Sequence, residues 1–66
     1  MFTIEELADK VKLRRRQALL TQQDLANKST VAVATIRDLE RGKLKDIKIS
    51  TLKKLFSVLN ITLKIK

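Results

Sequence analysis

Two short helical segments, separated by a turn of only four residues, constrain this chain more than any other feature. Thr21 is a favourable N-cap, and Asp24 stands three residues later, where its carboxylate can reach back to the cap as in a capping box. The pattern predicts a first helix, a turn and a second helix over Gln22–Asn27, Lys28–Val31 and Ala32–Arg41.

These two helices should pack against each other, because each has one apolar face. Leu25 and Ala26 face inward from the first helix, and Ile36 and Leu39 do so from the second. Gly42 then follows as a residue that takes the left-handed conformation easily and so ends a helix. Two packed helices joined by such a short turn form a helix-turn-helix unit. In that unit the second helix is where a DNA-binding protein places its base contacts.

Three short strings within this segment carry a specific resemblance. They are LTQQDLA at Leu20–Ala26, ATI at Ala34–Ile36 and LERG at Leu39–Gly42. With these strings at these spacings, the chain resembles the Cro/phage-repressor (Xre) helix-turn-helix family, from about Ile4 to the C-terminus. The resemblance implies an all-α, lambda-repressor-like bundle of four helices, and we expect residues 1–66 to form one domain.

Two residues depart from the pattern of that family. Thr30 stands where the family usually has Gly in the turn, and a β-branched residue is strained at positive φ, so the turn could be rearranged. Ala32 stands where the family usually has Ser or Thr as the N-cap of the second helix. Alanine cannot cap, which leaves Ser29, Thr30 or water for that role.

The composition narrows the classes of function. The chain has 15 basic and 7 acidic residues, a net charge of +8, and the excess lies mainly in residues 34–66. This balance favours a polyanionic partner: DNA, RNA or an anionic membrane. The two Phe residues are expected in the core, which leaves no stacking platform for RNA, and the apolar helix faces are needed for the core rather than a membrane. Cys and His are both missing from the sequence, so we expect neither an enzyme nor a metal or cofactor site.

An earlier helix is predicted from a second capping box. Thr3 and Glu6 form the T-x-x-E pattern, and apolar spacing continues the helix over Ile4–Leu19, with inward positions at Ile4, Leu7, Ala8, Val11, Ala18 and Leu19. Arg15 falls on the same inward stripe, and a buried guanidinium needs a partner. The family resemblance implies that this partner is Glu40. The alternative is that Arg15 reaches the edge of the stripe and contacts only water.

A lysine-rich loop and one more helix follow Gly42. We expect Leu44 and Ile47 to anchor the loop to the core, with its lysines, Lys43, Lys45 and Lys48, facing outward. Ser50 is expected to cap a helix over Thr51–Leu59 whose apolar face comprises Leu52, Leu55, Phe56 and Leu59. Asn60 is expected to terminate it.

The last six residues change from helical to alternating periodicity. Ile61, Leu63 and Ile65 face one way in an extended chain, which predicts a half-buried strand over 61–66. A two-fold partner would supply the same strand antiparallel, so these residues are the predicted dimerisation contacts. The tail resembles the HipB-like antitoxin and repressor subgroup. A frayed tail or a continued helix is the alternative.

The resemblance assigns DNA contacts residue by residue. The base-reading candidates lie at the start of the second helix of the unit: Ala32, Val33, Ala34, Arg37 and Asp38. The phosphate-binding candidates surround them: Gln22, Thr35, Arg41, Lys43 and Lys45. Two alternatives stay open, because Val33 could pack on its own fold and the cations could simply be solvated.

Together these observations favour a sequence-specific repressor that binds a palindromic operator on double-stranded DNA as a homodimer. The HipB-like tail implies an antitoxin that represses its own operon and binds a kinase-like toxin, in the cytoplasm and on the nucleoid. A phage or plasmid regulator without a toxin remains an alternative. So does a protein-interaction module that uses the same scaffold without DNA.

Overall fold

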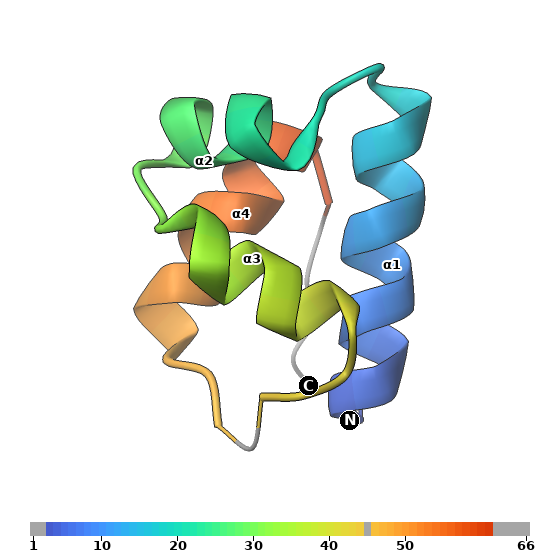
Figure 1. Cartoon of the computed structure of the whole chain (residues 1–66), viewed down its shortest axis with the longest axis vertical. Helices are drawn as coiled ribbons and strands as arrows, with labels where there is room; N and C mark the ends of the chain where they lie inside the picture. The colour runs from blue at the N-terminus through green and yellow to red at the C-terminus, as the bar shows by residue number, and fades with distance from the viewer. Residues whose placement is uncertain (1–2, 45, 62–66) are drawn as a thin grey trace.

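The computed structural model describes residues 3–44 and 46–61. This part of the chain contains four helices: α1 (Ile4–Gln17), α2 (Gln22–Ser29), α3 (Val33–Glu40) and α4 (Ile49–Leu59). In Figure 1, α1 stands along one side, α3 crosses the front, α4 lies behind α3, and α2 lies above both. The helices α1 and α2 each pack against both α3 and α4. None of the described helices is long and apolar enough to span a membrane.

All four helices contribute to one core. The five largest side chains that are fully buried come from every helix in turn: Val11, Leu25, Ile36, Leu39 and Leu55. The inward faces predicted for α2, α3 and α4 are confirmed, since every apolar residue assigned to them is buried. For α1 the prediction was wrong at its end, because Ala18 and Leu19 are exposed, Leu19 to 90%.

The first two helices begin at the predicted caps. The Thr3 hydroxyl accepts a hydrogen bond from the Glu6 N–H at 3.1 Å. At α2 the capping box is reciprocal, with the Asp24 N–H donating to Thr21 Oγ1 at 2.9 Å and the Thr21 N–H donating to Asp24 Oδ2 at 3.0 Å. Hydrogen bonds to the Asp24 carboxyl from the backbone N–H and the side chain of Thr21 lower its pKa, with a smaller contribution from the charge of Lys28.

Three helices end in the same way, with one left-handed residue followed by a hydrogen bond back into the last turn. The left-handed residues after α1, α3 and α4 are Leu19 (φ 59°), Gly42 (φ 70°) and Asn60 (φ 56°). The next N–H bonds to the carbonyl five residues earlier: Leu20 to Arg15, Lys43 to Asp38 and Ile61 to Phe56, at 3.1, 2.9 and 2.9 Å. This is the Schellman arrangement. Gly42 and Asn60 were predicted as terminators, whereas α1 ends at Gln17, two residues before the predicted Leu19.

The other helix bounds shift by one or two residues. Helix α2 continues to Ser29 rather than ending at Asn27, and α3 is shorter than predicted by one residue at each end. Ser50 does not cap α4, because the helix begins at Ile49 with Lys48 in the N-cap position and without a side-chain cap. Leu44 and Ile47 pack against the core as predicted. We attribute the early start to this anchoring, which brings the chain onto the core before Ser50.

The chain leaves α4 toward α1. Ile61 is buried in the core, and the Asn60 carbonyl accepts a hydrogen bond from Arg14 Nη2 at 3.0 Å. The rest of the predicted strand, with Leu63 and Ile65, lies outside the described residues, as does Lys45. The residues that are described contain no strand.

Candidate nucleic-acid interface

The turn between α2 and α3 keeps the left-handed conformation that glycine usually supplies. Thr30 adopts φ 61° despite its β-branch, so the turn is not rearranged. The Thr30 hydroxyl donates to the Ser29 carbonyl, and the buried Ser29 Oγ accepts from the Val31 N–H at 3.3 Å. Both hydroxyls are therefore used within the turn, and neither caps α3.

Helix α3 consequently begins without a side-chain cap. Ala32 is the N-cap residue, and its carbonyl accepts from the N–H groups of Thr35 and Ile36 at 3.0 and 3.2 Å. The first N–H groups of a helix have no partner within the helix. Together with the helix dipole, they make the start of α3 electrostatically suited to an anion such as a phosphate.

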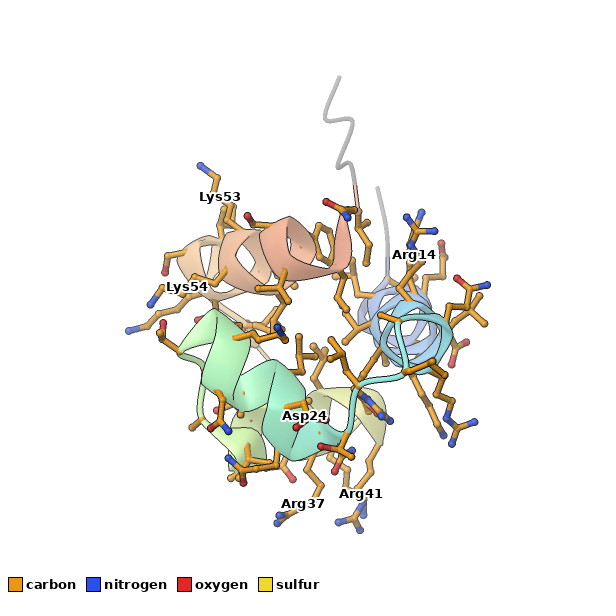
Figure 2. The ribbon with its side chains drawn as sticks, turned by 90° about the horizontal axis from the view of Figure 1, so that it is seen from above. Arg14, Asp24, Arg37, Arg41, Lys53 and Lys54 are labelled. Atoms are coloured by element: carbon orange, nitrogen blue, oxygen red, sulfur yellow. The ribbon has the colours of Figure 1, made fainter. Side chains whose placement is uncertain are left out.

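The predicted base-reading residues divide into exposed and half-buried ones. Ala32, Ala34 and Arg37 are exposed, and Asp38 is half-buried. Val33 is also half-buried. Its side chain, which was predicted to read a base, packs against the core. In Figure 2, Arg37 and Arg41 project from the same side of the molecule.

The predicted phosphate-binding residues lie around this helix. Arg41 and Lys43 are exposed, while Thr35 is half-buried. Gln22 is half-buried at the start of α2, and its Nε2 donates to Glu40 Oε1 at 3.3 Å. An amide nitrogen has two donors, so this contact leaves one donor of Gln22 for another acceptor.

A bidentate ion pair joins α1 to the end of α3. Arg15 Nε lies 2.7 Å from Glu40 Oε2, and Arg15 Nη2 lies 2.8 Å from Glu40 Oε1. The two side chains are only 11% and 2% exposed, so the alternative in which Arg15 contacts only water does not hold. The hydrogen bond to Glu40 raises the pKa of Arg15, and the carboxylate charge adds to this effect.

The same guanidinium makes a contact that sequence reasoning did not find. Arg15 Nη1 donates to the Leu20 carbonyl at 2.8 Å, in the connection between α1 and α2. Because the acceptor is a backbone atom, no residue type in the sequence signals it. Arg15, Glu40 and Gln22 thus link three helices behind the exposed face of α3.

Comparison with known families adds one finding. The model of a family described as helix-turn-helix matches residues 11–65. The matched segment begins within α1 and includes α2, α3 and α4. No curated protein matches the chain.

Proposed function

The chain belongs to this helix-turn-helix family, which is of the Cro/C1 type, and from that premise we propose that it is a transcriptional repressor. Domains of this family are DNA-binding domains of transcription regulators. In our proposal, two copies bind a palindromic operator, and each copy inserts α3 into the major groove. The half-sites then lie about one helical turn apart.

One observation carries this proposal: the start of α3 is an exposed, uncapped helix end with cations on the same side. Ala32, Ala34 and Arg37 are exposed there, and Arg41 projects beside Arg37 (Figure 2). Short side chains let the helix approach the base edges, while the arginines supply charge for the phosphates and for guanine.

The exposed residues of α3 can make only a few sequence-specific contacts with bases. Arg37 is suited to bidentate hydrogen bonds with guanine O6 and N7, which discriminate by about 1–3 kcal/mol. Ala32 and Ala34 offer only methyl groups, which suit the methyl group of thymine. Val33 and Asp38 are half-buried and would contribute less. We therefore propose that the shape of the operator carries part of the specificity.

Phosphate contacts would fix this helix in the groove. Arg41 and Lys43 follow α3 and are exposed, so they would hold the phosphates beyond its C-terminal end. The second amide donor of Gln22 and the hydroxyl of Thr35 would hold phosphates nearer the turn. Lys45 completes this set in the proposal.

The dimer and the antitoxin role rest on the C-terminal tail. Ile61, Leu63 and Ile65 alternate with polar residues, which favours a strand that pairs with its copy across a two-fold axis. Because Ile61 is buried in the core of its own chain, Leu63 and Ile65 would make the contacts across that axis. The HipB-like resemblance of this tail supports an antitoxin that represses its own operon in the cytoplasm, bound to the nucleoid, and holds a kinase-like toxin. A kinase-like reading frame beside the gene, whose product co-purifies with this chain, would favour the antitoxin over a phage or plasmid regulator.

Selection of bound sites from random duplex DNA tests the proposed repressor. We expect a symmetric site. With that site in hand, Arg37→Ala should lose affinity for it by roughly tenfold or more while keeping its affinity for random DNA. Lys43→Ala is the matched control, because loss of a phosphate contact should weaken binding to both DNAs alike.

A failure to bind duplex DNA would favour a protein-interaction module instead. That alternative is motivated by the apolar surface of Val33 and Ala34, of which Ala34 is exposed and Val33 half-buried, and by the missing cap. A protein that enriches no sequence and shifts no duplex at low salt would support it and would refute the repressor. Equal losses by Arg37→Ala on both DNAs would remove Arg37 as a base reader.

A further inference from the structure

A second basic feature lies away from α3. An open groove of about 440 Å³ runs between the end of α2 and the outer face of α4, and it is lined by Lys28, Ser29, Thr30, Lys53, Lys54, Ser57 and Val58. Figure 2 shows Lys53 projecting away from the side of the molecule that carries Arg37 and Arg41, and Lys54 projecting from the flank between them. The proposed DNA contacts therefore do not account for these lysines.

The lining has one sign of charge. It contains three lysines and no carboxylate. Within residues 3–44 and 46–61, the salt bridge between Arg15 and Glu40 involves none of these lysines, and Lys28 alone of the three acts on a carboxylate, that of Asp24 one turn earlier in α2. Like charges around one concavity repel one another, and an anionic group placed among them would relieve that repulsion.

The remaining lining limits what the anion can be. The exposed hydroxyl of Ser57 adds a hydrogen-bond donor, and half-buried Val58 adds an apolar wall. A volume of about 440 Å³ holds a few side chains. A glutamate side chain combines methylene groups with a carboxylate, so it matches both the apolar wall and the lysines. A duplex presents its phosphates on a convex surface, which fits a concave groove less well than a single flexible side chain does.

We propose that this groove binds an acidic segment of a partner protein, with glutamate or aspartate carboxylates held between Lys28, Lys53 and Lys54. The groove would leave the α3 face free, so one molecule could hold DNA and the partner together. This inference adds a binding surface to the proposed repressor, and it is tested separately from DNA binding.

The test is a titration of the full chain, labelled with ¹⁵N, with acetyl-hexaglutamate amide as the probe. We expect the largest amide shifts at 28–30 and 53–58, with little change across α3. The variant Lys53→Gln/Lys54→Gln should weaken binding of the peptide by about tenfold, as expected when two charge pairs of under 1 kcal/mol each are lost. A hexaglutamine peptide of the same length should cause no shifts.

A matched charge control separates the groove from the general field of the protein. Lys12→Gln/Arg16→Gln removes the same charge from α1 and should leave peptide affinity within about twofold. An equal loss of peptide affinity in both double variants would overturn the proposal, as would amide shifts spread over the whole basic surface. Either result would mean that the lysines of the groove are only solvated surface charges. A random duplex that shifts the groove residues more than the peptide does would also overturn it, in favour of nucleic acid. If operator binding fails but the peptide still binds the groove, only the proposed repressor is refuted.

Discussion

The ion pair between Arg15 and Glu40 holds the end of α3 against α1. Glu40 is almost fully buried and receives hydrogen bonds from Arg15 and Gln22. Removing one member of a buried pair leaves an uncompensated charge, which costs about 3–5 kcal/mol. We therefore expect Arg15→Ala to lose most of the stability of this small domain, as measured by urea unfolding.

Arg14→Ala is the control for that prediction. Arg14 is exposed and makes one hydrogen bond to the Asn60 carbonyl, so its loss should cost only about 1 kcal/mol. Arg15→Met combined with Glu40→Leu should recover much of the loss, since no buried charge then remains. Equal costs for Arg14→Ala and Arg15→Ala would show that the pair does not stabilise the fold.

Leu19 is the residue where a substitution should stabilise the chain. It is 90% exposed and adopts φ 59°, a conformation that costs an L-residue about 1–2 kcal/mol. Leu19→Gly removes that strain, while the greater freedom of glycine in the unfolded chain offsets part of the gain. The expected net gain is about 0.5–1 kcal/mol in urea unfolding. Leu19→Ala keeps the Cβ atom and should give no comparable gain.

At the scale of the element, α2 depends on a carboxylate at its first turn. Hydrogen bonds from Thr21 lower the pKa of Asp24 below its ordinary value of 3.8 in the folded chain. The stabilisation is therefore fully present above pH 3.8 and is lost as the pH falls through the lowered pKa. Wild type should unfold at higher urea than Asp24→Asn at neutral pH, and the difference should shrink below pH 3.8.

Asp9→Asn provides the comparison for this pH dependence, because Asp9 is an exposed carboxylate of α1 outside any cap. A difference between wild type and Asp24→Asn that stays constant down to acid pH would contradict the role given to Asp24.

The start of a helix could be predicted from the sequence where a nearby side chain caps it. The prediction failed where packing against the core sets the first residue of the helix. Thr3 and Thr21 act within three residues of the N–H groups that they bind, so their roles are visible in the sequence. Ser50 has the right chemistry for a cap, yet Leu44 and Ile47 bring the chain onto the core first and α4 begins earlier. The end of α1 was missed because leucine carries no signal for a left-handed residue.

At the scale of the whole molecule, the cations of α3 and those of α4 lie on different sides. The side with Arg37 and Arg41 is the proposed DNA side, and Lys53 lies opposite (Figure 2). Each phosphate neutralised should add about 0.9 to the slope of log affinity against log salt. We expect Arg41→Ala and Lys43→Ala each to reduce this slope by about 1, as measured by fluorescence anisotropy. Lys53→Ala should leave the slope unchanged, and a reduction there would mean that the DNA covers both sides.

The four-helix arrangement could be predicted because the apolar spacing of each helix and one family resemblance agree. The groove beside α4 could not, because Lys28 is brought to Lys53 and Lys54 only by the packing of α2 on α4. The ion pair between Arg15 and Glu40 was expected from the resemblance, while the polarity of Arg15 on an apolar stripe indicated only that some partner was needed.

The separation of roles within α3 has an evolutionary consequence. Ile36, Leu39 and Glu40 hold the helix in place, whereas Ala32, Ala34 and Arg37 are exposed at its surface. In the proposed repressor, substitutions at the exposed positions would therefore retarget the protein to a new operator while its scaffold stays intact. A lineage built on this scaffold could diversify its regulatory circuits by changing only these few codons.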